Sequence, residues 1–171
     1  ANIYMPYDFA LHRHDTSAPT VADNQAGDDA WRNSNTGSYD VDANDTGGSG
    51  LKEIQVKVYT GAGQTGSLVM DWAAQVSTSG VNSYTQNWAL AESTWTALRE
   101  GVNYVSVRSM DGALNVSALP AVDAFYVKKD VTGPTITDNQ AGDAVWRSTY
   151  SGVFYNVDFA DSLSGLATAQ Y

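Results

Sequence analysis

The chain has 171 residues, and its 19 acidic side chains outnumber its 9 lysines and arginines, so the net charge at pH 7 is −10. This acidic balance argues against nucleic acid and against an anionic membrane surface as partners, because few cations are present to neutralise phosphate groups. The sequence has no cysteine, which excludes disulfides and cysteine-ligated zinc. It also contains no apolar run of about 18 residues, so membrane insertion is not predicted.

A duplicated segment organises the chain. Residues 15–32 and 130–147 are identical at eleven of eighteen positions, at a constant offset of 115 residues, and both contain the sequence DNQAGD. A repeat of this length has the size of a compact domain, so we expect domains in tandem rather than a solenoid. The predicted pieces are the last strand of a preceding repeat at 1–14, a complete repeat at 15–129 and the first strands of an incomplete repeat at 130–171.

Within the complete repeat, alternating apolar and polar residues predict antiparallel strands with one buried face. Residues 93–100 instead read as one or two helical turns, with Ser93 as the N-cap and Gly101 as the stop. Short strands separated by turns rich in glycine and aspartate predict an all-β antiparallel sandwich. We expect its core to contain six of the alternating apolar residues: Tyr39, Val41, Ile54, Val56, Val105 and Val107.

Three motifs follow one another in a consistent order. They are DTSAPTV at 15–21, which recurs as DVTGPTI at 130–136, YDVDANDTGGSGL at 39–51 and GVNYVSVRSMDGALNVS at 101–117. Together they resemble bacterial Ig-like surface domains, with a stretch also found in fibronectin type III-like modules. The resemblance implies Ig-like β-sandwich repeats in tandem, in a large exported protein with a structural or adhesive role. Leu114 stands where that family usually has glycine.

Acidic side chains gather near two turns. Asp40, Asp42 and Asp45 lead into the glycine-rich stretch 46–50, and Asp23 and Asp28 belong to the duplicated DNQAGD loop. Calcium prefers carboxylate, amide and carbonyl oxygens, so a Ca²⁺ site at one of these turns is one interpretation. The favoured alternative is that aspartate, asparagine and glycine are simply the residues that turns require.

The tryptophans allow two uses. Trp31 and Trp146 occupy the same position in the duplicated segment, which predicts packing between domains. Trp72 and Trp88 could offer a platform for stacking on sugar rings, although packing in a core or interface is the favoured use of such large aromatic side chains.

Catalysis finds little support in the sequence. The two histidines, His12 and His14, form an H-x-H pair, but their counterparts Val127 and Lys129 cannot bind a metal in the same way, so an exposed basic strand end is the favoured interpretation. The complete repeat contains no histidine, and the chain has no cysteine nucleophile and no G-x-S-x-G motif. We predict that the protein is not an enzyme.

The leading hypothesis is a structural or adhesive extracellular repeat of a long bacterial surface protein or fibre, such as a stalk, an adhesin shaft or a surface layer. Its expected partners are neighbouring repeats or copies of the same chain. The incomplete end pieces predict either a window on a longer array or completion by neighbouring copies, and the former is favoured. The alternative hypothesis is a carbohydrate-binding accessory module of a secreted multidomain enzyme, with cell-surface or extracellular glycans as partners.

Overall fold

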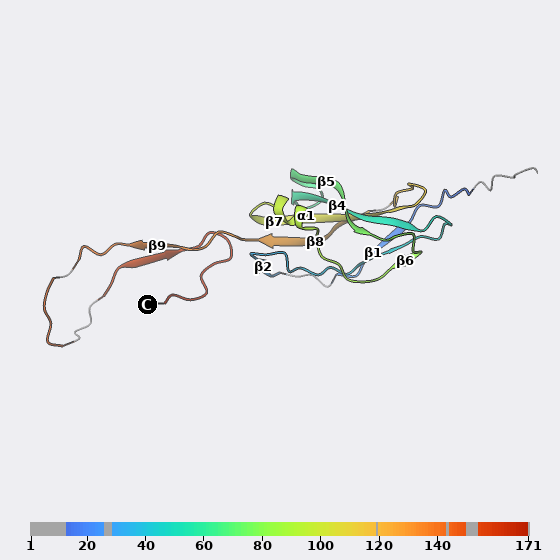
Figure 1. Ribbon diagram of the computed structural model, residues 1–171. Helices are drawn as coiled ribbons and strands as arrows, with labels where there is room; N and C mark the ends of the chain where they lie inside the picture. Colours follow the sequence, from blue (N-terminus) through green and yellow to red (C-terminus); the bar gives the residue numbers. More distant parts are fainter. Residues whose placement is uncertain (1–12, 26–28, 119, 143, 150–153, 171) are drawn as a thin grey trace, which may run out of the picture.

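The computed structural model describes residues 13–25, 29–118, 120–142, 144–149 and 154–170 (Figure 1). Its described residues form β-strands with one short helix, as the sequence predicts. The elements in chain order are β1 (Thr20–Asp23), β2 (Trp31–Arg32), β3 (Val41–Asn44), β4 (Leu51–Gly61), β5 (Thr65–Ser77), β6 (Ser83–Tyr84), α1 (Glu92–Ala97), β7 (Gly101–Asp111), β8 (Ala121–Lys129), β9 (Thr135–Asp138) and β10 (Val157–Ala160). None of the described helices is long and apolar enough to span a bilayer.

Two sheets make a sandwich-like body. One has the strand order β1-β3-β6, and the other has the order β2-β8-β7-β4-β5. All neighbouring strands in these sheets are antiparallel except the short pair β2 and β8, which is parallel. The strands β9 and β10 form a separate hairpin, which extends away from the sandwich (Figure 1).

The core lies between the two sheets. All six predicted core residues are at most 2% exposed, which confirms the alternation as the signal for the buried face. Aromatic side chains fill its middle: the ring of Tyr39 stacks on Phe125 with centroids 3.7 Å apart, and Trp88 meets both rings at steep angles. Complete burial of each large apolar side chain stabilises the fold by about 1.5–3 kcal/mol, so these strands provide most of its stability.

The helix α1 overlaps the predicted segment 93–100 but begins one residue before it and ends three residues earlier. Residue 91 is its N-cap and makes no side-chain capping bond, so the predicted cap Ser93 lies within α1. Trp95 and Leu98 are buried, and the Lys129 ammonium donates hydrogen bonds of 3.0 Å to the carbonyl oxygens of both. Lys129 therefore gives the carbonyl of Leu98 a partner and adds a second bond to that of Trp95, which also accepts the N–H of Leu98 over 3.2 Å. Packing replaces local capping as the reason for this helix.

The turn after β7 forms although Leu114 replaces the expected glycine. Leu114 has φ 72°, in the left-handed region that favours glycine, and its N–H donates to the carbonyl of Asp111 over 3.2 Å. The side chain of Asp111 accepts two further hydrogen bonds from Asn115. These bonds impose the strained conformation on Leu114.

The two copies of the duplicated segment form the same antiparallel strand pair, called a hairpin below although β2 lies between β1 and β3 in the chain. In the first, Thr20 pairs with Asn44 across β1 and β3, and in the second, Thr135 pairs with Ala160 across β9 and β10. In each pair the threonine hydroxyl donates to the opposite carbonyl over 3.2 Å. Residues 1–12, including most of the predicted strand at 1–14, lie outside the described residues, and Arg13 and His14 belong to no strand.

Candidate functional site: an acidic cluster beside the first strand

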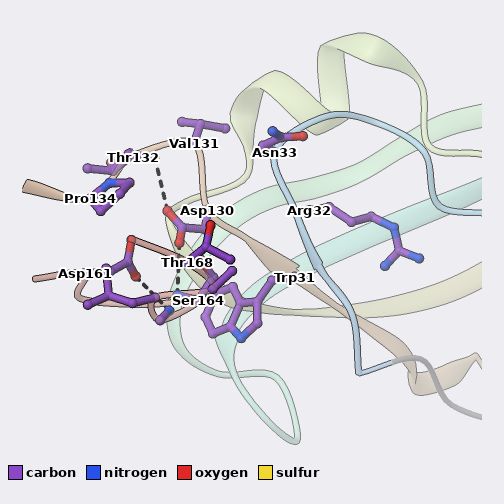
Figure 2. A pocket seen from close by; sticks show the side chains of 14 residues that line it. Trp31, Arg32, Asn33, Asp130, Val131, Thr132, Pro134, Asp161, Ser164 and Thr168 are labelled. Carbon is purple, nitrogen blue, oxygen red and sulfur yellow. Dashed lines mark hydrogen bonds between the residues drawn. The ribbon is translucent and has the colours of Figure 1, made fainter. Parts of the chain in front are cut away.

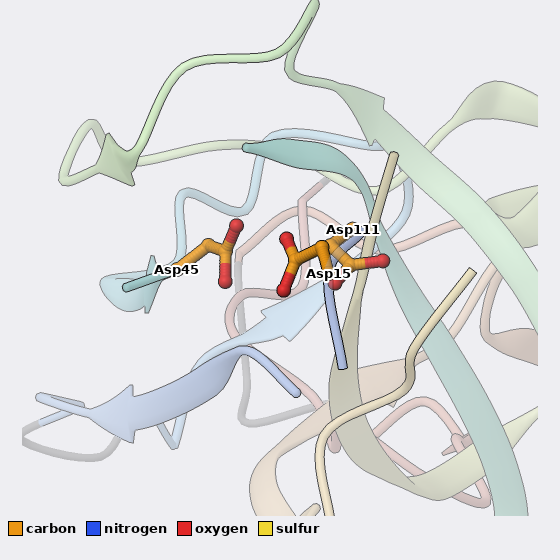
Figure 3. Close-up of side chains that lie close together, drawn as sticks. All are labelled: Asp15, Asp45 and Asp111. Atoms are coloured by element: carbon orange, nitrogen blue, oxygen red, sulfur yellow. The ribbon is translucent and has the colours of Figure 1, made fainter. Parts of the chain in front are cut away.

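Three aspartates far apart in the sequence meet at one end of the sandwich (Figure 3). Asp15 lies in the segment before β1, Asp45 follows directly after β3, and Asp111 is the last residue of β7. Each offers a carboxylate oxygen, and these three oxygens all lie within 4.8 Å of one another. Three like charges at this separation repel one another strongly, so the cluster is the clearest candidate for a functional site.

Backbone hydrogen bonds fix the loop that carries Asp45. The N–H of Asp45 donates to the carbonyl of Asn82 over 2.8 Å, and the N–H of Leu51 donates to that of Val81 over 2.7 Å. Gly112, next to Asp111, donates its N–H to the carbonyl of Gly50 over 2.8 Å. The loop 45–51 is therefore held at both ends, and its position relative to β7 is defined.

Glycine at position 47 makes room for the carboxylate of Asp15. A Cβ atom on Gly47 would lie 2.2 Å from Asp15 Oδ2 and 2.3 Å from Asp15 Oδ1, closer than real contacts allow. Gly47 thus allows the Asp15 side chain to approach the loop, in addition to its role in the turn itself.

Hydrogen bonds hold two of the carboxylates. Asp15 accepts the N–H of Ser17 at Oδ1 over 2.9 Å and the N–H of Ser49 at Oδ2 over 2.8 Å. The Ser49 hydroxyl and the backbone N–H groups of Ser17 and Ser49 lower the pKa of Asp15 below its ordinary value. Asp111 accepts the N–H of Asn115 over 2.8 Å and its side-chain amide over 2.7 Å.

Asp45 is held less completely. The residue is 2% exposed, and its Oδ1 accepts the N–H of Gly47 over 3.0 Å. Its Oδ2 is buried and has no hydrogen-bond partner among the described residues. Figure 3 shows the Asp45 carboxylate pointing toward Asp15. A buried carboxylate oxygen without a partner is costly, which makes it the most informative atom of the cluster.

Within the described part of the chain, the three carboxylates form no ion pair with lysine or arginine. Arg13 and His14 line a cavity of about 570 Å³ together with Asp15, Gly48, Ser49, Gly112 and Ala113. His14 is exposed, and His12, its partner in the H-x-H pair, lies outside the described residues.

The acidic residues singled out in the sequence divide between two roles. Asp45 belongs to the cluster, whereas Asp42 accepts a hydrogen bond from the side-chain amide of Asn24 over 2.9 Å. Asp23 accepts the N–H of Gln25 over 2.9 Å, as expected of an aspartate that shapes a turn. Asp40 is partly exposed and outside the cluster, and Asp28 lies outside the described residues.

The acidic site expected from the sequence at Asp45 did not include Asp15 and Asp111. A weak signal was present, because Asp15 opens the duplicated segment and Asp111 stands in the last of the three motifs. Their approach depends on the pairing of whole strands, which no local pattern in the sequence reveals.

Two of the three acidic positions have counterparts in the second copy of the segment, and the position equivalent to Asp111 falls outside the 171 residues of the chain. Asp130, the counterpart of Asp15, accepts the N–H groups of Thr132 over 3.1 Å and Ser164 over 2.9 Å. Asp161, the counterpart of Asp45, accepts those of Leu163 over 3.0 Å and Gly165 over 2.8 Å. These side chains line a cavity of about 510 Å³, to which Trp31 also contributes (Figure 2).

Trp31 therefore lies where the sandwich meets the following hairpin. Its ring also lies 5.5 Å from the Lys128 ammonium, and Arg32 points away from the cavity (Figure 2). Trp146, which has the same position in the second copy, is 100% exposed.

The remaining tryptophans lie in different environments. Trp88 is buried, and its indole N–H donates to the carbonyl of Val41 over 3.1 Å, so it packs in the core and offers no face to a sugar. Trp72 is half-buried on β5, where the Arg108 guanidinium lies 4.4 Å and the Lys57 ammonium 5.9 Å from its ring.

No protein-family model matches the chain, and no curated protein sequence matches it. The resemblance to bacterial Ig-like surface domains therefore rests on the three motifs and their order.

Proposed function

We propose that this chain is a structural or adhesive segment of a long bacterial surface protein, built from Ig-like β-sandwich repeats in tandem and acting outside the cell. The observation that carries the proposal is the repetition of detailed hydrogen bonding in the duplicated segment. Asn24 bonds to Asp42 over 2.9 Å, and Asn139 bonds to Asp158 over 2.8 Å in the second copy. Repetition of sequence together with conformation is typical of arrays in which each domain has the same mechanical task.

The joint between the sandwich and the second hairpin supports a stiff rod. Five residues, 130–134, connect β8 to β9. The N–H of Asp130 donates to the carbonyl of Arg32 over 2.9 Å, while the Asp130 carboxylate accepts the N–H of Ser164 from the hairpin side. Val131 donates its N–H to the carboxylate of Glu100 over 3.1 Å. Because the joint is short and bonded on both sides, the repeats would keep a defined relative orientation.

The charge of the chain is compatible with this function. A net charge of −10 keeps a long exposed surface soluble and self-repelling. In this proposal the partners are neighbouring repeats and copies of the same chain, and the protein has no catalytic activity.

Small-angle X-ray scattering on tandem copies tests the proposal. Residues 15–129 are joined head to tail in one, two and three copies, so that each Lys129 precedes an Asp15 in place of the natural Asp130. A stiff rod gives a constant increase in maximum dimension with each copy. The matched control replaces residues 15–19 of the inner copies by a glycine- and serine-rich segment. Such a flexible joint gives a smaller maximum dimension and a broader distribution of interatomic distances. Equal distributions for the two series would refute a rod with rigid joints.

One observation favours a second candidate, a carbohydrate-binding module. Trp72 is partly exposed on the outer face of the larger sheet, beside Arg108 and Lys57. A glycan array tests this candidate: binding that Trp72→Ala abolishes and Trp146→Ala leaves intact would support it. Absence of binding by the unmodified chain would eliminate it.

A further inference from the structure

We propose that Asp15, Asp45 and Asp111 form a calcium site that fastens the segment before β1 to the body of the sandwich. The site differs from the one expected at Asp40, Asp42 and Asp45 or in the DNQAGD loop. It combines one residue of that expectation with two residues that only the fold brings near.

The spacing of the oxygens suits one ion. Calcium binds oxygen at about 2.3–2.6 Å, so two oxygens on opposite sides of the ion are about 4.6–5.2 Å apart. The three carboxylate oxygens of the cluster all lie within 4.8 Å of one another, a spacing compatible with contact to a single central cation.

The unpartnered oxygen is the second, independent observation. Asp45 Oδ2 is buried, has no hydrogen-bond partner among the described residues and belongs to a carboxylate directed at the cluster. A cation would compensate both the missing hydrogen bond and the repulsion between the three negative charges.

The hydrogen bonds already present leave room for the ion. The carboxylates of Asp15 and Asp111 accept N–H groups at both oxygens, but each oxygen has a second lone pair. These bonds orient the two carboxylates before an ion arrives. Such pre-orientation reduces the entropy lost on binding.

The location of the ligands gives the site a mechanical consequence. Asp45 follows a strand of the smaller sheet, Asp111 ends a strand of the larger sheet, and Asp15 belongs to the connecting segment. An ion held by all three therefore ties both sheets to the segment that leads into the sandwich. Calcium would thus control how firmly this joint is fixed.

The second copy of the segment provides an internal reference. Asp130 and Asp161 repeat two of the ligand positions, but the described residues provide no third carboxylate beside them. The proposal assigns calcium to the complete cluster.

Isothermal titration calorimetry and thermal unfolding of the 171-residue chain test the site. The protein is freed of metal with a chelator, which is then removed, and Ca²⁺ is added. We expect saturable binding of one ion per chain and, at a hundredfold excess over Kd, a rise in Tm of about 5–10 °C. No saturable binding, or tighter binding of Mg²⁺ than of Ca²⁺, would overturn the proposal.

Asp45→Asn separates a metal ligand from a purely structural residue. The variant should lose at least about a hundredfold in calcium affinity while its metal-free Tm stays equal to or exceeds that of the unmodified chain, since it removes a buried uncompensated charge. A lower metal-free Tm with unchanged calcium binding would show that Asp45 is only structural and would refute the site.

Two further variants complete the test. Asp15 lies outside the sheets, so Asp15→Asn should weaken calcium binding while the chain still folds. This variant keeps the test valid even if Asp45→Asn fails to fold. Asp161→Asn is the matched control in the second copy and should bind calcium as the unmodified chain does. Loss of binding in Asp161→Asn but not in Asp15→Asn would place the ion elsewhere and overturn the assignment.

Discussion

Residues 15–51 and 130–166 have closely similar sequences and the same hairpin hydrogen bonds, yet their side chains differ greatly in burial. Tyr39 is 2% exposed and its counterpart Tyr155 is 69% exposed; Leu51 is 0% exposed and its counterpart Leu166 is 50% exposed. The first hairpin is covered by β4, β7 and β8, whereas β9 and β10 pair only with each other. The hairpin conformation is thus local, and burial depends on strands much later in the repeat.

This difference separates two contributions to stability. Hydrogen bonds within a hairpin replace bonds to water and contribute only about 0.5–1.5 kcal/mol each. Apolar side chains contribute when another layer removes them from water. Substitutions at equivalent positions of the two segments should therefore have unequal effects.

The largest difference is expected at the paired leucines. Leu51→Ala removes a fully buried side chain and should lower the free energy of unfolding by about 2–5 kcal/mol. Leu166→Ala, the matched control, should change it by less than about 0.5 kcal/mol, because its side chain is half exposed. Urea denaturation followed by tryptophan fluorescence measures both. Equal losses at the two positions would mean that the second hairpin contributes to the same cooperative core.

A smaller difference in the free energy of unfolding is expected between a side chain that joins α1 to β7 and one that bonds only within the first hairpin. The buried amide of Asn103 donates to the carbonyl of Arg99 over 2.7 Å and accepts the N–H of Arg99 over 3.0 Å, which closes the turn between α1 and β7. Asn103→Ala leaves these groups unpaired and should cost about 1–3 kcal/mol. Asn24→Ala removes one bond inside the first hairpin and should cost about 0.5 kcal/mol or less. Chemical denaturation compares the two variants, and a larger loss for Asn24→Ala would reverse the argument.

The same contrast explains what the sequence could predict. Alternation identified the core residues of β3, β4 and β7, because one face of a half-buried strand packs on the core and the other faces water. The resemblance of 130–147 to 15–32 predicted a repeated local structure, which the paired hydrogen bonds of β9 and β10 show.

The acidic cluster required information that no local pattern contains. Asp15, Asp45 and Asp111 are brought together by the arrangement of both sheets, and aspartates that shape turns, such as Asp23, look the same in the sequence. The same holds for the start of the helix. Ser93 has the chemistry of an N-cap, but the buried side chains of Trp95 and Lys129 determine where α1 lies. In both cases tertiary contacts outweighed local preference.

The paired tryptophans provide the third prediction. Trp31 is half-buried at the joint and has the Lys128 ammonium 5.5 Å from its ring, so Trp31→Ala should lower the free energy of unfolding by about 1 kcal/mol. Trp146→Ala removes a side chain that is 100% exposed and should have no effect beyond about 0.5 kcal/mol. Thermal unfolding by circular dichroism measures both variants. A greater loss for Trp146→Ala would assign the packing role to the second copy.

The smallest expected effect arises where the two copies differ in charge. Asp29 forms an ion pair with Lys128 and accepts the Tyr126 hydroxyl over 3.0 Å, whereas its counterpart in the second copy is Ala144. Lys128 and the Tyr126 hydroxyl lower the pKa of Asp29, and Asp29 in turn raises the pKa of Lys128. Both directions favour the charged pair in the folded protein, but solvent and salt screen an interaction at so exposed a carboxylate.

The pH dependence follows from the direction of these pKa changes. A carboxyl whose pKa is lowered on folding stabilises the fold above its unfolded pKa of about 3.9, and this contribution disappears as the pH falls through the folded pKa. A lysine whose pKa is raised contributes below about pH 10.4 and loses the contribution as the pH rises through the folded pKa. Asp29→Asn should therefore lower Tm slightly near pH 7, by an amount that vanishes in strong acid and in strong base and shrinks in 1 M salt. The second copy already has alanine here, so Ala144→Asn serves as the control and should leave Tm unchanged at every pH. A Tm difference for Asp29→Asn that persisted unchanged into strong acid would show that the residue stabilises the fold through its shape and hydrogen bonds rather than through its charge.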